Sequence, residues 1–295
     1  MIFVASQADA SALNLGKISI KTINDVSQET YDVIAAYGNK SFTDDQIIAI
    51  DDFLIAFNNA SWKSKVKRLI IPLLSNDNNN PTVSTNGVSY ENLYDIVTKE
   101  AGKLASGAGT NGYTGSPAIT FKGGIFVNAV VNNANTTPFL KYSEIAFNVR
   151  DFMFGVYGNR GTDENNISKH IIFSIREPNY SCSFTTKSIQ VGASNKVSVI
   201  STKETNKGDD FGILLSYNYS SSFFKGYKDS MLVSTSTVTD TYANGTINDS
   251  FGFGTGSNLT KNIGDKIRII TLGSSMNEEE MQEYDKLLQT LLSCF

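Results

Sequence analysis

Apolar residues recur at helical spacing in the stretch that begins at Thr43. Three- and four-residue steps separate Ile47, Ile50, Phe53, Leu54 and Phe57, which places them along one face of a helix. Thr43 and Gln46 have the spacing of a capping box, and Asp44 and Asp45 put negative charge in the first turn, where the helix dipole favours it. The pattern predicts an amphipathic helix that needs a large apolar surface to lie on.

Two further helices are predicted toward the chain ends. The segment from Val26 to Lys40 is expected to form a short helix that stops at Gly38. Asn277 and Glu280 repeat the capping-box spacing, and an apolar stripe follows at Met281, Tyr284, Leu287, Leu288, Leu291 and Leu292. We expect the helix at Thr43 and this last helix to pack near the same edge of a sheet.

From Ala118 onward the pattern changes to short β-rich segments. Turn-forming residues such as Gly123 and Gly158 separate them, and the alternation of Val197 and Val199 with polar neighbours is typical of half-buried strands. Such strands predict a mostly β chain, an antiparallel jelly-roll sandwich with flanking N-terminal helices and a C-terminal amphipathic helix. The predicted strands are Ala118–Phe121, Gly124–Val131, Ser143–Val149, Phe152–Tyr157, Ile167–Arg176, Lys187–Val191, Lys196–Thr202, Gly212–Tyr219, Ser230–Val238 and Lys266–Leu272.

Three connecting segments are assigned from their own residues. Ser61–Lys67 is expected to be a short helix or turn that carries the only tryptophan. Leu69–Leu74 is interrupted by Pro72, so it is expected to be a short edge strand. Tyr90–Ala105 is expected to hold a short helix.

Glycine-rich stretches are interpreted as connections and not as nucleotide sites. Gly107–Gly115 lacks the Gly-Lys-Ser/Thr of a phosphate loop, and Phe251–Gly256 is expected to be a glycine-bent loop with no helix after it. The expected division is an attachment arm at 1–24, a helical entry segment at 25–74, a polar and glycine-rich connection at 75–117, and a β-sandwich with its C-terminal helix at 118–295.

The N-terminal arm is the expected attachment segment. Its apolar clusters are poorly periodic, and it lacks the charged start and long apolar run of a signal peptide. No stretch of the chain approaches the roughly 20 apolar residues that span a bilayer. We expect the arm to dock on a partner or to add a strand to a neighbour's sheet, with Ile2, Phe3 and Val4 as the attachment residues.

Composition indicates a folded protein with no general attraction to polyanions. Hydrophobic residues make up 40% and charged residues 18%, which is typical of folded domains and not of disordered chains. The formal net charge of −4 gives no overall attraction to nucleic acid or to an anionic membrane. The one local basic cluster, Lys63, Lys65, Lys67 and Arg68, is interpreted as a solvated face.

The candidate catalytic residues do not form a known pattern. His170 is the only histidine, and no Gly-x-Ser-x-Gly elbow accompanies it, so a structural histidine is favoured and His170→Ala is expected to leave function intact. No strand carries the two closely spaced carboxylates of a retaining glycosidase. The sequence therefore predicts a protein without enzymatic activity.

Two loops hold the oxygen ligands that calcium prefers, at Asp209–Asp210 and at Asp163–Asn165. Acidic loops without ligand spacing are usually solvated, so no cofactor is expected. Either a sugar-stacking platform or core packing explains a group of aromatic residues near the sandwich loops, and core packing is favoured; these are Tyr217, Tyr219, Phe223, Phe224 and Tyr227.

Cys182 and Cys294 are the only cysteines. Their separation gives neither metal-ligand spacing nor a Cys-x-x-Cys pair. Two unpaired thiols in a protein assembled in a reducing cell are expected, although a disulfide between them stays open.

The helical stripes also predict which substitutions matter. Phe53 and Leu288 lie on the stripes and are expected to be buried, so alanine at either position should cost about 2–5 kcal/mol. Asp51 and Glu283 lie off the stripes, so their replacement should cost less than about 0.5 kcal/mol.

The order of elements resembles phage virion structural proteins with a C-terminal concanavalin A-like (LamG-type) jelly roll. A pattern of the form Y-x-x-[VI]-x-A, then a helix, then W-x-K-[VL]-x-x-L-x-[LI] precedes the sandwich in that family. The similar residues here are Tyr31, Ile34 and Ala35, with the alanine one position earlier than in the pattern, and then Trp62, Lys65, Val66, Leu69 and Ile71, with one more residue between the tryptophan and the lysine. The family's ending, G-[AS]-S-[LM]-[TN]-x-x-E before a Leu-rich helix, is matched by Gly273, Ser274, Ser275, Met276, Asn277 and Glu280.

The resemblance covers Tyr31–Phe295 and rests on motifs at its two ends. The middle matches only in its succession of short β-rich segments. It implies a virion location and a non-enzymatic structural role as a head fibre, tail fibre or decoration protein. It also implies other virion proteins as partners of the N-terminal segment, a homo-oligomer, and a lectin-like sandwich for which a host-surface glycan is the alternative partner. A glycan hydrolase is a distant alternative.

Overall fold

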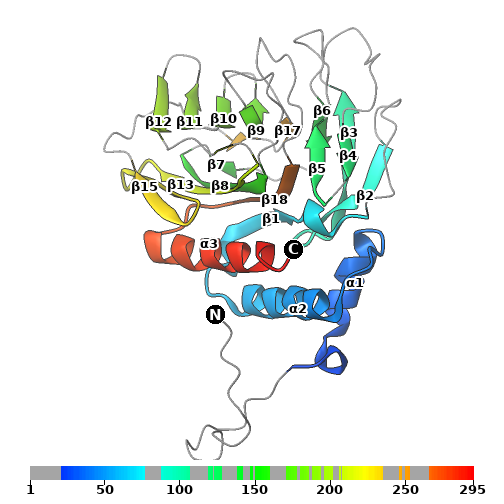
Figure 1. Cartoon of the computed structure of the whole chain (residues 1–295). Coiled ribbons are helices and arrows are strands. Elements are labelled where there is room, and N and C mark those ends of the chain that lie inside the picture. Colours follow the sequence, from blue (N-terminus) through cyan, green and yellow to red (C-terminus); the bar gives the residue numbers. More distant parts are fainter. Residues whose placement is uncertain are drawn as a thin grey trace, which may run out of the picture.

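The computed structural model shows a helical layer packed on one face of a two-layered β structure (Figure 1). Helix α3 lies directly on the nearer layer of strands, and α2 lies on the far side of α3 from that layer. The described residues are 21–76, 88–106, 119–121, 123–127, 138–141, 147–148, 150–159, 171–177, 180–185, 188–193, 196–201, 206, 208–234, 246–247, 250–252 and 266–295.

The helices begin and end where their local sequence predicts. Thr43 caps α2 and Asn277 caps α3, each in a reciprocal capping box with the residue three positions later. Gly38, at φ 90°, follows the end of α1 and donates to the Ala35 carbonyl at 2.9 Å, so the predicted stop is confirmed. The helices are α1 (Gln28–Ala36), α2 (Asp44–Asn59) and α3 (Glu278–Leu292), with 3-10 turns η1 (Ile23–Asp25), η2 (Lys63–Lys65) and η3 (Pro72–Leu74).

The strands pair antiparallel along one continuous path. It runs β15-β14-β13-β8-β18-β1-β2-β3-β6-β17-β9-β10-β11-β12, with β4 and β5 added beside β18 and β7 and β16 beside β8. The path folds over between β1 and β6, so that β15 to β1 form the layer next to α3 and β17 to β12 form the layer farther from it (Figure 1). The fold is mostly β, an antiparallel sandwich of the jelly-roll class, as predicted. The strands are β1 (Val66–Ile70), β2 (Val88–Asp95), β3 (Glu100–Ser106), β4 (Ile119–Phe121), β5 (Ile125–Val127), β6 (Pro138–Lys141), β7 (Phe147–Asn148), β8 (Asp151–Asn159), β9 (Ile171–Glu177), β10 (Tyr180–Thr185), β11 (Ser188–Ala193), β12 (Lys196–Ser201), β13 (Asp210–Asn218), β14 (Phe223–Lys228), β15 (Met231–Ser234), β16 (Thr246–Ile247), β17 (Ser250–Gly252) and β18 (Lys266–Gly273).

The central strands of the nearer layer are buried on both faces. Every residue of β8 from Phe152 to Gly158 is buried, and so is every residue of β13 from Phe211 to Tyr217. Alternate side chains such as Met153 and Leu214 join the core beneath the helices, and the side chains between them point to the opposite face. Burial on both faces is expected when a helical layer covers one side of a sheet and a second layer of strands covers the other.

A glycine of β13 lies beside the side chain of Gln289 on α3. A Cβ atom placed on Gly212 would lie 2.2 Å from Nε2 of Gln289 and 2.6 Å from Cδ1 of the buried Tyr157 ring on β8. A larger residue at this position would therefore have to displace the Gln289 amide and the Tyr157 ring.

The predicted helix at Tyr90–Ala105 is wrong, because this stretch forms the β2–β3 hairpin. Asp95 organises the turn: it accepts a hydrogen bond from the Val97 amide at 3.0 Å, and its carbonyl accepts one from the Lys99 amide at 2.8 Å. Lys99 has a φ of 59°, outside the helical region. Both strands fall in the stretch that was expected to be a connection, 75–117.

Two smaller expectations are also wrong. The strand expected at Leu69–Leu74 is β1, which runs from Val66 to Ile70 and pairs with β18 on one side and with β2 on the other, so it is not an edge strand. Pro72 follows β1 and begins η3, where it removes no donor from the ladder. The stretch expected to be a loop from Phe251 contains part of β17.

Candidate functional site

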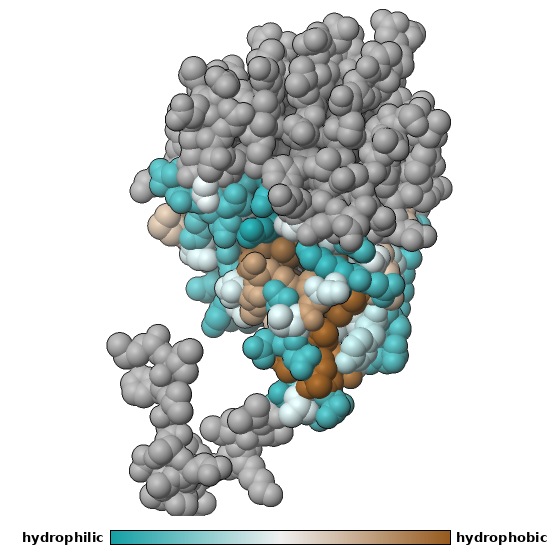
Figure 2. Space-filling view, turned by 45° about the vertical axis from the view of Figure 1, so that its right-hand side comes forward, coloured by the Kyte–Doolittle hydropathy of each residue, from teal (hydrophilic) through white to brown (hydrophobic). Residues whose placement is uncertain are grey.

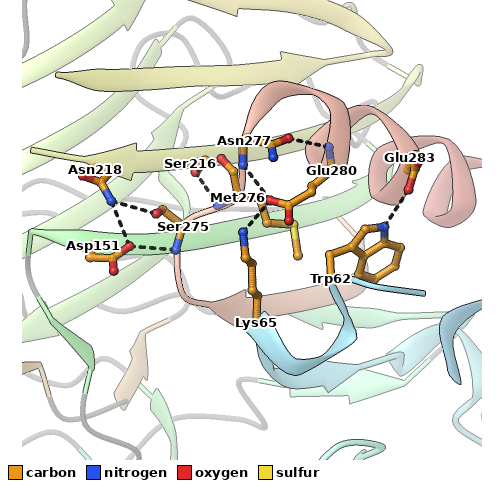
Figure 3. A network of polar contacts seen from close by, with 10 residues as sticks. All are labelled: Trp62, Lys65, Asp151, Ser216, Asn218, Ser275, Met276, Asn277, Glu280 and Glu283. Atoms are coloured by element: carbon orange, nitrogen blue, oxygen red, sulfur yellow. Dashed lines mark hydrogen bonds and ion pairs between the residues drawn. The ribbon is translucent and has the colours of Figure 1, made fainter. Parts of the chain in front are cut away.

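The polar residues that the structure brings together lie mostly at the joint between the helical layer and the sandwich. Figure 3 shows the link from β18 to α3, the segment that carries the family-like ending. The Ser275 amide donates to Asp151 of β8 at 3.0 Å, and the Met276 amide donates to Ser216 of β13 at 2.8 Å. Asn218 donates to the Ser275 hydroxyl at 3.1 Å. The link is therefore bonded to two central strands before the helix begins.

The same link is bonded to the segment that follows α2. A Cβ on Gly273 would lie 2.0 Å from the Lys65 carbonyl oxygen, which accepts a hydrogen bond from the Ser274 amide at 2.9 Å. Lys65 forms an ion pair with Glu280 at 2.6 Å, and Trp62 donates to Glu283 at 3.0 Å (Figure 3). The two parts of the chain that carry the resemblance therefore meet at one joint.

An aromatic cluster fills the joint beneath these contacts. The ring centroids of Trp62 and Tyr284 lie 4.6 Å apart, and those of Phe57 and Trp62 lie 5.9 Å apart. The Tyr284 hydroxyl is within 2.7 Å of the Thr271 hydroxyl on β18. Burial raises the pKa of Tyr284 well above its usual value, so the phenol stays neutral and keeps this hydrogen bond.

Asp51 ties the start of the described chain to α2. It is fully buried and accepts hydrogen bonds from the Ser27 amide at 3.0 Å, the Ser27 hydroxyl at 2.5 Å and the Thr30 hydroxyl at 2.6 Å. Lys21 forms ion pairs with Asp51 and with Asp52. Burial by itself raises the pKa of Asp51, but the hydrogen bonds from Lys21, Ser27 and Thr30 outweigh it and hold the pKa well below its usual value.

The structure therefore argues against the small loss of stability predicted for replacing Asp51 or Glu283. Asp51 lies beside the apolar stripe of α2, but α1 packs against α2, and its partners Lys21, Ser27 and Thr30 come from α1 and from the residues that precede it. Glu283 is the acceptor for the only tryptophan. The predicted burial of Phe53 and Leu288 is confirmed, at 3% and 0% exposure.

The basic cluster is divided between surface and core, which corrects its interpretation as a solvated face. Arg68 is fully buried and pairs with Asp95 at 2.8 Å. Asp95 also accepts a hydrogen bond from the Leu69 amide at 3.0 Å, so the pair joins β1 to the β2–β3 turn. Lys63 and Lys67 are at the surface, where they line a groove of about 610 Å³ together with Ala60, Ser64, Val66 and Thr98.

A cavity of about 370 Å³ lies between α3 and the turn from β14 to β15. Its lining includes Tyr227, Ser230, Gln282, Asp285, Lys286 and Gln289. Asp285 is 2% exposed and accepts a hydrogen bond from the buried Tyr157 hydroxyl at 2.7 Å. Burial raises the pKa of Asp285, and the hydrogen bonds from Tyr157 and Ser230 oppose this rise without cancelling it. The cavity therefore offers an acceptor, amide and ammonium donors, and an aromatic ring.

The turn beside this cavity has an uncommon backbone. Asp229 and Ser230 have φ values of 51° and 62°, in the left-handed region. The Asp229 carboxylate accepts a hydrogen bond from the Gly212 amide at 2.9 Å, and the Gly212 carbonyl accepts one from the Asp229 amide at 2.8 Å. Asx residues tolerate this conformation better than most, and the two bonds fix Ser230 beside Asp285. Sequence reasoning missed this site because its lining comes from two separated segments and the partner of Asp285, Tyr157, from a third.

The predicted attachment residues Ile2, Phe3 and Val4 lie outside the described residues, and so do His170 and the candidate calcium ligands at Asp163–Asn165. At the other candidate loop, Asp210 accepts hydrogen bonds from Asn159 at 2.8 Å and from Arg268 at 3.3 Å. Within the described ranges, no group of three or more His, Cys, Asp or Glu residues is placed to hold a metal ion.

The predicted aromatic group is divided. Tyr217 and Phe224 are core residues whose ring centroids lie 5.7 Å apart in an edge contact. Tyr219 and Phe223 are half-buried, and each carries a cation near its ring, from Arg150 and Lys225 respectively. Tyr227 is 6% exposed and reaches the cavity under α3. Three of the five, Tyr217, Phe224 and Tyr227, are buried as core packing predicts, and Tyr227 also lines the cavity under α3.

Cys294 has a free, exposed thiol near the end of the chain, which agrees with the expected unpaired state for this residue. Its Sγ atom donates to the Thr290 carbonyl at 3.4 Å. Cys182 lies in β10, and its side chain is outside the described part. No helix in the described ranges is long and apolar enough to cross a bilayer.

No known protein family matches the chain, and no curated protein matches it. Among solved structures, the chain is similar to the Trypanosoma rangeli sialidase in complex with sialic acid, at 9% identity and a TM-score of 0.46, over 77% of this chain and 33% of that chain. It is also similar to the receptor binding domain of botulinum neurotoxin D, at 12% identity and a TM-score of 0.46, over 76% of this chain and 52% of that chain. The chain spans about a third of the sialidase and about half of the toxin chain.

Proposed function

We propose that this chain is a non-enzymatic structural component of a phage virion, a head fibre, tail fibre or decoration protein that displays a lectin-like sandwich. The observation that carries the proposal is the pair of ion pairs that Lys21 forms with α2, called the Lys21 clamp. Lys21 is held by Asp51 and Asp52, so residues 1–20 join the body at the helical layer, on the side away from the strands β9 to β12 (Figure 1). An arm that leaves at one end can attach the chain while the sandwich projects.

The joint between helices and sheet supports the same function. The motif residues that carry the resemblance bond the helical layer to β8 and β13 through backbone amides. In the described part of the chain, the buried ions Asp51, Arg68 and Asp95 hold neighbouring segments together. A rigid joint transmits load from an attachment arm to a displayed domain, which is what a fibre or decoration protein requires.

The test removes the arm and keeps the clamp. A variant lacking residues 1–20 retains Lys21 and should melt at the same temperature as the intact chain. In purified particles of the phage that encodes the chain, quantitative mass spectrometry should find the intact chain and little of the truncated one. The triple change Ile2→Ser, Phe3→Ser and Val4→Ser should act like the truncation, whereas Ser6→Ala with Gln7→Ala should incorporate normally. Normal incorporation of the truncated chain would place the attachment elsewhere.

A second candidate function is glycan binding, which the cavity under α3 favours. Sugar sites combine an aromatic ring with carboxylates and amides that bridge neighbouring hydroxyls. Here Tyr227 lies beside Asp285, Gln282 and Gln289. The lining carries one carboxyl group, on Asp285, and one ammonium group, on Lys286, so its charges do not select an acidic sugar and neutral sugars are the expected ligands.

Saturation-transfer NMR with galactose, glucose, N-acetylglucosamine and N-acetylneuraminate tests this second function. We expect a signal from a neutral sugar that Gln289→Ala removes and that the distant change Gln46→Ala leaves intact. No signal with any of the four sugars would reject the cavity as a sugar site, and released reducing sugar from an oligosaccharide would contradict a non-enzymatic role.

A further inference from the structure

The strand β15, at the end of the nearer layer, has one edge that no strand covers in the described part of the chain. In that part it pairs with β14 alone, and Figure 1 shows it at the left-hand end of the layer next to α3. Two of the four large hydrophobic side chains exposed in the described ranges follow each other on this strand, Met231 at 59% and Leu232 at 44%. Figure 2 shows hydrophobic surface on the left-hand side of the described body as well as at its centre. Because successive side chains point to opposite faces of a strand, exposed apolar surface lies on both faces of this edge.

The tight turn before β15 determines which of its backbone groups face β14. Lys228 and Met231 are paired, and the two residues between them, Asp229 and Ser230, both have a positive φ, as a type I′ turn requires. In such a hairpin the two residues that flank the turn bond to each other, so the backbone groups of Met231 point to β14. The Asp229 amide points the other way and donates to the Gly212 carbonyl of β13 at 2.8 Å, as the alternation along β14 demands.

The backbone groups farther along β15 alternate in the same manner. Those of Val233 point to β14, and the N–H and C=O groups of Leu232 and Ser234 point to the open edge. Edge strands are usually protected by a charged residue, a proline or a bulge. Residues 231–234 contain no charged residue and no proline, and their pairing with β14 has no register shift. The edge is therefore suited to accept a further strand.

We propose that this further strand is β15 of a second copy of the chain, paired antiparallel about a two-fold axis at Val233. A two-fold contact requires a surface that is complementary to itself. With the axis at Val233, the outward N–H and C=O groups of Leu232 in each copy bond to those of Ser234 in the other. The two Val233 residues then face each other as a non-hydrogen-bonded pair of β-branched side chains, which stabilises antiparallel strands.

Two features of the strand favour a second copy as the occupant. An antiparallel copy supplies the matching donors and acceptors in the same number, so no other protein is needed to satisfy the edge. The chain carries a net charge of −4, but none of this charge lies on residues 231–234, so the contact brings no like charges together on the strand. The two nearer layers would join into one continuous sheet that runs through both copies.

Sedimentation velocity on the intact chain tests the dimer. From about 1 to 200 μM it should show a monomer–dimer equilibrium, because a short strand offers a small contact and small contacts bind weakly. Added salt should not weaken the dimer, because no charged residue lies on the strand.

Two substitutions on β15 should weaken the dimer, each by about tenfold or more. Leu232→Pro removes an outward N–H and keeps the N–H groups that bond to β14, so the chain should still melt as the wild type does. Val233→Lys places two like charges face to face at the axis. Ile55→Lys, the same kind of change at an exposed apolar side chain of α2, is the control and should have no effect.

Disulfide cross-linking tests the register. The Cα atoms of a non-hydrogen-bonded antiparallel pair lie about 4.5 Å apart, within the range that a disulfide spans. Val233→Cys should therefore give a covalent dimer on oxidation, and mass spectrometry should find the two copies linked through this position. Met231→Cys has the more exposed side chain, but the register offsets the two Met231 positions by about 13 Å along the strands, so it should cross-link much more slowly.

The dimer does not depend on the proposed virion role. A chain that stays monomeric throughout the concentration range overturns the proposal. A dimer that Leu232→Pro and Val233→Lys both leave unchanged also overturns it, because its contact then lies elsewhere. Equal rates of cross-linking for Val233→Cys and Met231→Cys would overturn the axis at Val233, since random collisions do not favour the less exposed position.

Discussion

The carboxylate of Asp51 collects its hydrogen bonds from Lys21, Ser27 and Thr30, which all precede α2 in the chain. A buried carboxylate is stable only when such donors replace water. By sequence spacing Asp51 lies off the apolar stripe, and that spacing describes only the helix itself. The donors come from α1 and from the residues that precede it, and the packing of this segment on α2 is a tertiary contact that the local pattern does not contain.

Replacing Asp51 should therefore destabilise the protein strongly at neutral pH. Asp51→Ala leaves the charged Lys21 and the Ser27 and Thr30 donors without their acceptor, so we expect a loss of about 2–3 kcal/mol in chemical denaturation at pH 7. Asp52 also pairs with Lys21, but its side chain is 62% exposed. Asp52→Ala is the control and should cost less than about 1 kcal/mol. Equal losses would mean that the buried hydrogen bonds contribute nothing.

The difference in unfolding free energy between the wild type and Asp51→Ala should decrease as the pH falls. The folded pKa of Asp51 is lowered, below an unfolded value of about 3.9, so its stabilisation is present above the unfolded pKa and is lost as the pH falls through the folded pKa. The gap between the wild type and Asp51→Ala should be largest near pH 7 and shrink below about pH 4. A gap that grows on acidification would contradict the assignment of Asp51 as an ionised acceptor.

Asp285 should show the opposite trend. Its pKa is raised by burial, so the folded state binds the proton more tightly than the unfolded state. The stability contributed by Asp285 is therefore full below the unfolded pKa and falls as the pH rises through the folded pKa. Asp285→Asn still accepts the hydrogen bond from Tyr157 but carries no charge. We expect this variant to be at least as stable as the wild type at pH 7, and the wild type to gain on it as the pH is lowered toward 4. Thermal melts across this range compare the two.

At the scale of elements, the helices were predictable because their signals are local. The capping boxes at Thr43 and Asn277 and the stop at Gly38 depend on residues within a few positions of each other. The β2–β3 hairpin was not predictable in this way. Leu93, Ile96 and Leu104 lie at spacings that suit a helix, and pairing with β1 and β6 decides the outcome.

The candidate sites were less predictable than the fold. Asp285 lies within the helix predicted after Asn277, and its partner Tyr157 lies 128 positions away. Arg68 follows three lysines in the sequence, which favours a solvated face, but alternation along β1 places it on the buried side, where it pairs with Asp95. Long-range pairing decides both environments, and neither composition nor periodicity contains that information.

The contact between α2 and α3 predicts that substitutions on the two helices affect stability jointly. Phe57 and Tyr284 have ring centroids 6.4 Å apart, so the effects of Phe57→Ala and Tyr284→Ala should be non-additive by about 0.5–3 kcal/mol in a double-mutant cycle. Phe53→Ala and Leu288→Ala should each cost about 2–5 kcal/mol, because both side chains are buried. Additive effects for Phe57 and Tyr284 would mean that the helices do not support each other. Urea denaturation provides all of these values.

At the scale of the molecule, the helical layer and the sandwich share their central strands. Met153, Tyr157, Leu214 and Ile269 point from β8, β13 and β18 into the core beneath the helices, while neighbouring residues of the same strands face the opposite side. Loss of the helical layer would expose one whole face of these strands to water. The two parts are therefore expected to behave as one cooperative unit and not as a stable sandwich with a detachable stalk.

The only tryptophan allows this cooperativity to be measured. Trp62 is 2% exposed and lies at the joint of α2, α3 and β1, so its fluorescence reports on the helical layer. Circular dichroism near 215 nm reports mainly on the strands. In guanidinium titrations the two signals should change together, as expected for a two-state transition. Leu288→Ala should move both midpoints to lower denaturant by the same amount, because the cavity it creates lies in the shared unit. A fluorescence transition that precedes the loss of strand signal would show that the helical layer unfolds by itself, and it would contradict the rigid joint that the proposed display function requires.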